Sequence, residues 1–567
     1  NLANLRAAVD ERGGLNGASN GAGVHTGIGH TRWATHGRVT EANAHPHFDT
    51  ADRVHVVVNG IVENFAILRE RLIAGGARFT SETDAEVIAH LIASHGDQGL
   101  KGAVTAAVAE LEGHYAFVAM SAAEPGSLVA FRKECPLVIG QGDGELFVGS
   151  AIPAFLQYTR HALTIEDGEV VELRAEGATI HGEDGIVERE TYEVEWDEET
   201  AEKGGYDTFM LKEIHEQADA VAETIADRLW QDDAVDFGED FDLEPLRNAT
   251  RIVIVACGTS YHAGLLGRYV IEEYARVPVD VEVASEYRYR NPVLRPSDVV
   301  IGITQSGETA DTLAAMRVAR ESGATVLAVT NVMGSQATRD ADGVLFTRAG
   351  LEIGVAATKT FMCQLAVMYL LALKLAELRE VQSVSERREL IAGLKAIPHA
   401  ITELLEQSEA SIKRAADDHH AADFFLYLGR HVGLPIALEG ALKLKEVSYI
   451  ATDAYPAGEM KHGPIALLDE QTPVVVVATN SPVREKVISN IQEVRARGAH
   501  VLAVVTAGDE AAMSEHTDEV FPVPLTDWTL QPLLAVIPLQ LLAYEIAVRR
   551  GLNVDQPRNL AKTVTVE

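Results

Sequence analysis

Apolar and polar positions alternate in a regular pattern through the last two thirds of the chain. Residues 298–312 show it most clearly: an apolar run at 299–303 breaks into a small polar turn, and an amphipathic pattern begins at Asp311. Such a pattern predicts a buried strand, a tight turn and the start of a helix. Backbone N–H groups and the positive end of the helix dipole point out of such a turn, so it can bind an anion.

This pattern occurs twice along the chain. Residues 251–264 and 423–440 each read as strand, glycine-containing turn and helix, and residues 298–331 and 472–508 repeat a longer strand–helix–strand unit. Alternation of apolar runs with helical patterns predicts two parallel, doubly wound α/β domains. Ligands of such sheets bind beyond the carboxyl ends of the strands.

The two copies differ at those strand ends. The first carries hydroxyl residues, in Cys257-Gly-Thr-Ser260 and Thr304-Gln-Ser-Gly-Glu-Thr309, whereas the second has Gly429-Arg-His-Val432 and Asn480-Ser-Pro482. Hydroxyls add hydrogen-bond donors without charge, and no nucleotide-binding GxxxxGK[ST] motif occurs. We therefore predict a sugar phosphate in the first copy alone, although hydroxyl-rich turns are also ordinary helix caps.

The N-terminal third has a different pattern. It predicts short strands and one good helix, over residues 54–58, 115–119, 128–132, 146–149 and 83–94. An acidic, glycine-containing stretch at 181–205 follows, and its charge predicts a solvated linker.

Composition narrows the class of protein. The apolar stretches 361–373 and 533–548 are interrupted by polar residues and predict buried helices, not membrane spans. The net charge of −36 argues against nucleic-acid or anionic-membrane partners. Three cysteines predict no disulfide framework, which fits a reducing cytoplasm.

Three short segments together describe a site for an amino-acid amide. Thr31–Gly37 contains Arg32, a two-pronged clamp for a carboxylate. Asp84 can hold an α-ammonium group, and the Asn59 side chain with the Gly60 N–H can form an oxyanion hole. Each of these motifs alone is weak evidence for such a site.

The second repeat and the C-terminus hold another cluster of charges. Lys443 and Glu446 are three residues apart and so share a helix face, where a surface salt bridge is the simplest interpretation. Residues 461–464 (Lys-His-Gly-Pro) and the tail at 555–562 add further basic groups. The tail is not of low complexity, so we do not expect it to be a simple disordered end.

These segments resemble the glutamine–fructose-6-phosphate aminotransferase family. The resemblance is carried, in order, by TRWATHG, NGIVEN, SETDAEVIAH, ACGTSYHAG, TQSGETADTL, EIGVAATKTF, LKLKEVSYI, GEMKHGP and NVDQPRNLAKTVTVE. It implies α/β and α+β architecture: a four-layer αββα glutaminase of the N-terminal-nucleophile type, followed by two doubly wound sugar-isomerase (SIS) domains. The implied boundaries are 1–195 for the glutaminase, 196–206 for a linker, 207–383 and 384–551 for the SIS domains, and 552–567 for a catalytic tail.

The resemblance also implies roles for individual residues. Glutamine-binding residues would be Arg32, Trp33, His36, Asn59, Gly60 and Asp84, with Trp33 as the gate of an ammonia channel. Phosphosugar-binding residues would be Thr259, Ser260, Thr304, Gln305, Ser306, Thr309, Val355 and Ala356. Glu446 would move a proton between C1 and C2 with Lys443 as its partner, and His462, supplied by a neighbouring subunit, would open the sugar ring. Lys562 would form an imine with the C2 ketone.

The implied reaction converts fructose 6-phosphate and glutamine into glucosamine 6-phosphate and glutamate, for amino-sugar nucleotide synthesis. The expected enzyme is a cytoplasmic homodimer with a shared sugar site, no metal and no cofactor. Two alternatives stay open: a sugar-phosphate isomerase without glutaminase activity, and a non-catalytic phosphosugar-binding regulator.

The sequence departs from the family pattern at its start. The family's glutaminase uses an N-terminal cysteine, whereas this sequence begins with Asn1, and Cys135 lies far from the expected position. We therefore expect the native enzyme to have a preceding segment. Thr304 in place of a serine and Ala357 in place of a hydroxyl residue are smaller departures that should not abolish binding.

Overall fold

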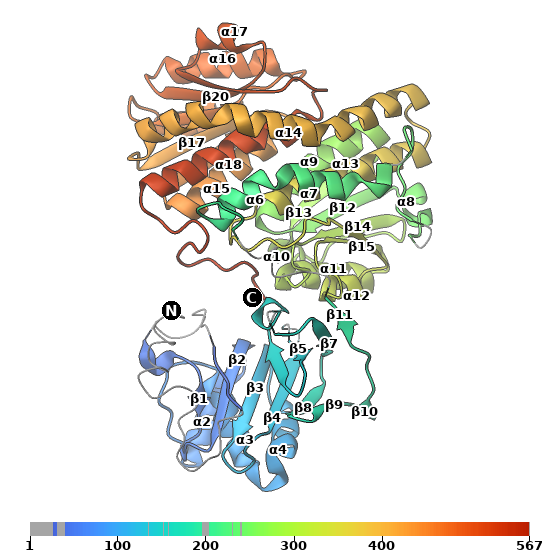
Figure 1. Ribbon diagram of the computed structural model, residues 1–567, viewed down its shortest axis with the longest axis vertical. Helices are drawn as coiled ribbons and strands as arrows, with labels where there is room; N and C mark the ends of the chain where they lie inside the picture. Colours follow the sequence, from blue (N-terminus) through green and yellow to red (C-terminus); the bar gives the residue numbers. More distant parts are fainter. Residues whose placement is uncertain are drawn as a thin grey trace. The chain divides into compact units, whose positions relative to one another are not determined.

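The computed structural model describes residues 26–30, 40–133, 135, 137–150, 152–156, 158–194, 203–229, 231–238 and 241–565. The chain divides into two compact units (Figure 1). Unit 1 comprises residues 1–198 and 564–567, and unit 2 comprises residues 199–563. Arg32, Trp33 and His36 lie outside the described residues.

The described residues of unit 1 form two antiparallel sheets. The first has the order β1 (His47–Phe48), β2 (Val54–Val62), β3 (Gly113–Ser121), β4 (Leu128–Lys133), β8 (Val170–Arg174), β9 (Gly177–Gly182), β10 (Gly185–Val187). The second has the order β11 (Tyr192–Glu193), β7 (His161–Thr164), β5 (Val138–Gln141), β6 (Leu146–Gly149). The helices are α2 (Phe65–Ala74), α3 (Glu86–Ser94) and α4 (Gly99–Val108), with 3₁₀ turns η1 (Glu41–Asn43), η2 (Gly96–Gln98) and η3 (Ile152–Ala154).

Strand β3 shows how these layers stack. Its residues alternate between the two faces of the sheet, and both faces are buried. Tyr115 and Phe117 pack in one core with helices α3 and α4, whereas Ala116 and Val118 pack in another with the second sheet. The described residues thus form a helical layer and two sheet layers of the predicted glutaminase fold.

The predicted linker at 181–205 is wrong over its first half. Residues 181–193 contribute to strands β9, β10 and β11. Gly182 pairs with Gly185, so the acidic residues Glu183 and Asp184 form the two-residue turn of a hairpin. The acidic residues Glu183 and Asp184 thus belong to a hairpin and not to a linker.

Unit 2 contains two five-stranded parallel sheets with the same strand order. The first runs β13 (Val279–Val283), β12 (Arg251–Ala256), β14 (Asp298–Ile303), β15 (Thr325–Thr330), β16 (Gly343–Phe346). The second runs β18 (Ala451–Pro456), β17 (Phe424–Gly429), β19 (Pro473–Val477), β20 (His500–Thr506), β21 (Glu519–Val523). The matching orders confirm the predicted duplication.

Helices pack on both sheets of unit 2 (Figure 1). They are α6 (Phe209–His215), α7 (Gln217–Ile225), α8 (Glu244–Asn248), α9 (Gly258–Ala275), α10 (Ala284–Tyr287), α11 (Ala310–Glu321), α12 (Gln336–Asp340), α13 (Lys359–Leu378), α14 (Val384–His419), α15 (Gly433–Ser448), α16 (Arg484–Arg495), α17 (Glu510–Ser514) and α18 (Gln531–Arg549). The 3₁₀ turns are η4 (Asp227–Leu229), η5 (Glu459–His462) and η6 (Pro464–Leu467).

One continuous core joins the two halves of unit 2. Residues of both sheets and of α9, α13, α14, α15 and α18 belong to a single apolar cluster. In the described part of the chain, α13 and α18 are long and apolar enough to cross a membrane, but 89% of each apolar segment is buried in this core. They are therefore the buried core helices that the sequence predicted.

Candidate active sites

Strand β2 carries the residues of the predicted oxyanion hole. Asn59 and Gly60 lie near its end, and Gly60 has a φ of +122°, a conformation that favours glycine. The buried Asp84 accepts a hydrogen bond from the Val62 N–H at 2.8 Å, which places its carboxylate beside the same strand. The structure therefore brings together the three described residues of the predicted amide site.

A buried carboxylate that sequence reasoning missed holds the loop before α3. Glu86 accepts hydrogen bonds from the N–H groups of Thr80 and Ser81, each at 2.7 Å, and from the Ser81 hydroxyl at 2.6 Å. Burial alone would raise the pKa of Glu86, but these bonds and His90 lower it to about 2. Glu86 therefore stays ionised and fixes the loop that carries Asp84. The sequence feature that could have pointed to Glu86 is its position within the motif SETDAEVIAH.

The last described residue of the chain, Thr565, also reaches strand β2. The Asn59 side-chain amide donates a hydrogen bond to the Thr565 hydroxyl at 3.2 Å. The Thr565 carbonyl accepts a hydrogen bond from Cys135 at 3.5 Å. The end of the chain therefore packs in unit 1 beside the predicted oxyanion hole.

The predicted phosphate turn connects β14 to α11. The hydroxyls of Thr304 and Thr309 lie 2.8 Å apart, and Thr304 accepts a hydrogen bond from the Gly307 N–H at 3.2 Å. Gly307 has a φ of +72°, and a Cβ there would lie 1.9 Å from the Ser335 hydroxyl oxygen. The turn therefore requires glycine at position 307. Its tight conformation places the Thr304 and Thr309 hydroxyls close together at the start of α11.

The other hydroxyl cluster follows the neighbouring strand. Thr259 and Ser260 lie in the first turn of α9, directly after β12. Strands β12 and β14 pair in parallel, so their carboxyl ends lie at the same edge of the sheet. In the order β13-β12-β14, the second strand of the chain lies on one side of the first and the third strand lies on the other. Such a switch in strand order is where α/β sheets form a binding crevice.

Helix α15 of the second repeat presents its charges to this edge. Lys443 is fully buried, and its Nζ lies 2.6 Å from Glu446 Oε2, 3.3 Å from Glu439 Oε1 and 3.2 Å from the Thr259 hydroxyl. Burial lowers the pKa of Lys443, but the two carboxylates outweigh this and raise it. Burial raises the pKa of Glu446, the property that a carboxyl needs to exchange a proton with carbon.

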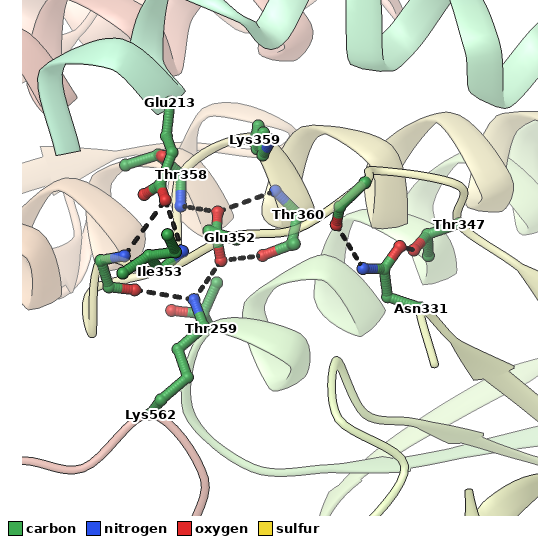
Figure 2. Close-up of polar contacts among 12 residues, drawn as sticks. Glu213, Thr259, Asn331, Thr347, Glu352, Ile353, Thr358, Lys359, Thr360 and Lys562 are labelled. Carbon is green, nitrogen blue, oxygen red and sulfur yellow. Dashed lines mark hydrogen bonds and ion pairs between the residues drawn. The ribbon is translucent and has the colours of Figure 1, made fainter. Parts of the chain in front are cut away.

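Lys562, in the C-terminal tail, points into unit 2 (Figure 2). Its Nζ contacts the carboxylate of Glu352, which is wholly buried, and donates to the Gly354 carbonyl at 2.8 Å. Glu352 also accepts hydrogen bonds from the Thr360 hydroxyl at 2.6 Å and from the N–H groups of Thr358 and Thr360. Lys562 is thereby fixed beside Val355 and Ala356, the predicted sugar contacts.

Helix α13 connects the Lys562 pocket with the hydroxyl cluster. Thr360 binds Glu352, and Gln364, four residues later, donates a hydrogen bond to the Ser260 hydroxyl at 3.0 Å. Residues four apart on a helix lie on one face, roughly 5–6 Å apart. One region of unit 2 is therefore bordered by Lys562, by Ser260, and by Lys443, which contacts the adjoining Thr259.

Comparison with known proteins identifies this arrangement. The family model described as a glutamine amidotransferase domain matches residues 30–157, and the SIS domain model matches residues 245–374 and 423–550. A glutamine–fructose-6-phosphate aminotransferase from Mycolicibacterium smegmatis is 48% identical, with 100% of this chain and 92% of that protein covered. The chain belongs to the glutamine–fructose-6-phosphate aminotransferase family. A member from Gloeobacter violaceus is 49% identical over 98% of this chain and 91% of its own.

Solved structures support the same family assignment for unit 2. The C-terminal domain of an aminotransferase of this family from Francisella tularensis has a TM-score of 0.61 at 39% identity, covering 63% of this chain and 99% of that chain. A glucosamine-6-phosphate deaminase from Thermotoga maritima has a TM-score of 0.51 at 26% identity, covering 64% and 100%. The predicted fold, a glutaminase domain followed by two SIS domains, is confirmed.

His462 differs from the other predicted catalytic residues in its contacts. It lies exposed in turn η5, and within the described ranges it makes no hydrogen bond or ion pair with another predicted site residue. Cys135, by contrast, is wholly buried, as expected of a core cysteine. No group of three or more His, Cys, Asp or Glu residues that could hold a metal occurs in the part of the chain that is described.

Proposed function

We propose that this protein converts fructose 6-phosphate and glutamine into glucosamine 6-phosphate and glutamate. The observation that carries the proposal is the position of the Lys562 side chain. It extends from the C-terminal tail and contacts the Glu352 carboxylate and the Gly354 carbonyl, beside the hydroxyl-rich strand ends. A regulator that only bound a sugar phosphate would need no lysine paired with a buried carboxylate there. The proposed domains are 1–195, 207–383 and 384–551, with a linker at 196–206 and a catalytic tail at 552–567.

The glutaminase half binds glutamine by its charged ends. Arg32 holds the α-carboxylate, with Trp33 and His36 beside it, and Asp84 holds the α-ammonium group. Asn59 and the Gly60 N–H stabilise the oxyanion that develops at the amide carbon, where one such donor is worth roughly 2.7–4 kcal/mol. The ammonia released there passes to the sugar site.

The sugar half binds the phosphate at the two hydroxyl-rich turns. Its proposed ligands are Thr259, Ser260, Thr304, Gln305, Ser306 and Thr309, with Val355 and Ala356 against the sugar. Lys562 attacks the C2 ketone and forms an imine with loss of water. An ordinary lysine has a pKa of about 10.4, so a neutral amine at pH 7 costs roughly 4–5 kcal/mol.

The remaining proposed roles concern proton transfer and assembly. Glu446, with Lys443 as its partner, moves the proton between C1 and C2 after ammonia has replaced the lysine. His462, which is exposed in turn η5, opens the sugar ring of a neighbouring subunit, so the working enzyme is a homodimer. It acts in the cytoplasm, without a metal or cofactor, in the synthesis of amino-sugar nucleotides.

The test follows the amide nitrogen. The purified protein is incubated with fructose 6-phosphate and amide-¹⁵N-glutamine, and the products are followed by NMR. We expect labelled glucosamine 6-phosphate and an equal amount of glutamate, loss of the amino sugar in Lys562→Ala, and its retention in Lys486→Ala, an exposed control. Glucose 6-phosphate without glutamate would favour an isomerase instead, and no turnover would contradict an enzymatic role.

A further inference from the structure

A second buried carboxyl lies next to Lys562 and Glu352. Glu213, on helix α6, is buried, and its Oε1 accepts hydrogen bonds from the N–H groups of Ile353 at 2.5 Å and Gly354 at 3.1 Å (Figure 2). Glu352 and Glu213 therefore both face the short segment whose carbonyl, at Gly354, accepts from Lys562. Two buried carboxyls and the partly exposed Lys562 share a single site.

The other oxygen of Glu213 is unusual. Its Oε2 is buried and has no hydrogen-bond partner among the described residues. Burying an ionised carboxylate oxygen without a partner is costly, whereas a protonated carboxyl avoids most of that cost. Burial, together with the negative charge of Glu352, raises the pKa of Glu213 to about 8. At neutral pH Glu213 is thus mainly a neutral acid.

The other charged groups around this site are already paired. Lys359, at the start of α13, and Lys212, on α6, both bind Glu216, at 2.8 Å and 3.4 Å. The thiol of Cys363 on α13 is fully buried, and burial raises its pKa, so it stays neutral. Lys562 and Glu352 are therefore left as the charged pair that faces Glu213.

We propose that Glu213 is a positioning residue that controls when Lys562 can become a neutral amine. When Glu213 is neutral, Lys562 faces one carboxylate, and it can pass its proton to Glu352 Oε2 as the sugar displaces water. The freed lone pair then attacks the C2 carbon, and the carbonyl oxygen takes one proton from the lysine nitrogen and one from Glu352. It leaves as water, which gives the protonated imine and restores the Glu352 carboxylate. When Glu213 is ionised, two carboxylates hold Lys562 as an ammonium ion, which cannot attack.

The inference, which rests on the proposed imine role of Lys562, predicts an unusual pH profile. Imine formation by an isolated lysine becomes faster as pH rises, because more amine is free. In this protein the rate of imine formation on Lys562 should instead fall above pH 8. For one ionisation near pH 8, the neutral fraction of Glu213, and with it the rate, drops about tenfold between pH 7 and pH 9.

The experiment measures the initial rate at which cyanoborohydride traps radiolabelled fructose 6-phosphate on the protein between pH 6.5 and 9.5. Glu213→Gln keeps an oxygen that can accept from the two N–H groups but cannot ionise, so we expect its rate to change less than twofold above pH 7. Glu223→Gln, an exposed change on helix α7, should keep the wild-type fall. Thermal unfolding of each variant verifies its fold.

Identical alkaline profiles for wild type and a folded Glu213→Gln would overturn this role. That failure is distinguishable from failure of the proposed function, because a wild-type protein that makes labelled glucosamine 6-phosphate has already passed the test of function. Replacement by Glu213→Asn, with a shorter amide, adds a second variant. It should also lack the alkaline fall, even if its absolute rate is lower.

Discussion

Lys443 Nζ lies 2.6 Å from Glu446 Oε2, at a place where the lysine is fully buried and the glutamate is partly exposed. The sequence spacing is also compatible with a simple surface salt bridge, which contributes little to stability. Burial of Lys443 excludes that interpretation. The pair instead extends from the interior of unit 2 toward the hydroxyl-rich strand ends, with Thr259 3.2 Å from the same Nζ.

The first prediction concerns the stability of this pair. Lys443→Met removes the cation beside the fully buried Glu439, which keeps His262, at 2.7 Å, and the Thr259 hydroxyl, at 3.0 Å, as side-chain partners. Breaking a buried pair from one side costs about 3–5 kcal/mol. Urea unfolding of unit 2 at pH 7 should show a loss of that order. Lys445→Met, an exposed change on the same helix, should shift it by less than about 0.5 kcal/mol; equal losses would contradict the assigned burial.

The second prediction separates proton transfer from imine formation. Glu446→Gln cannot accept a proton, so exchange of the sugar C1 proton with ²H₂O, followed by NMR, should slow about 10²–10⁴-fold. Trapping of the sugar on Lys562 should persist, because that step does not need Glu446. Glu470→Gln, an exposed change, serves as the control. Exchange at the wild-type rate in Glu446→Gln would exclude it as the base.

The third prediction concerns the phosphate turn. The Ser306 hydroxyl accepts a hydrogen bond from the Glu308 N–H at 3.1 Å and lies at the start of α11. Ser306→Ala removes one donor to a charged phosphate, worth about 1.5–3 kcal/mol, so the Kd for fructose 6-phosphate should rise at least tenfold. Ser322→Ala, at the other end of α11, where the hydroxyl donates to the Val318 carbonyl, should leave the Kd within twofold. Calorimetric titration decides between these outcomes.

The fourth prediction concerns acid stability of unit 1. The folded-state pKa of Glu86 is about 2, below its ordinary value of 4.5, so its ionised form stabilises the fold above pH 4.5. That contribution, on the order of 3 kcal/mol, is lost as pH falls from about 5 toward 2. The Glu86→Gln variant should unfold at a lower temperature than wild type at pH 7. Its unfolding temperature should also decrease less than that of wild type when the pH is lowered. Glu70→Gln, exposed on α2, should retain the wild-type pH dependence; the same dependence in Glu86→Gln would contradict the role of Glu86.

Local patterns in the sequence predicted the architecture of unit 2 because each strand–turn–helix unit is encoded in adjacent residues. The run 298–312 became β14, the Thr304–Thr309 turn and the start of α11. In unit 1 the same approach misread residues 181–193, since it weighed the acidic charges above the hairpin spacing of Gly182 and Gly185.

The partners of the site residues could not be read in this way. Lys562 meets Glu352, 210 residues away, and Glu213 lies on a helix that precedes both SIS sheets. Glu213 and Gln364 look like ordinary polar residues of amphipathic helices, because only the folded chain shows which of them face the sugar-phosphate region. The resemblance identified Lys562, whereas its contacts with Glu352 and Gly354 came from the structure.

The most direct test of the account is to find which lysine forms the imine. The protein is incubated with fructose 6-phosphate and sodium borohydride at neutral pH, digested, and analysed by peptide mass spectrometry. The account predicts a reduced sugar-phosphate adduct on Lys562 and none in Lys562→Arg. An adduct on another lysine, such as Lys443, or synthesis of glucosamine 6-phosphate by Lys562→Arg at the wild-type rate, would contradict it.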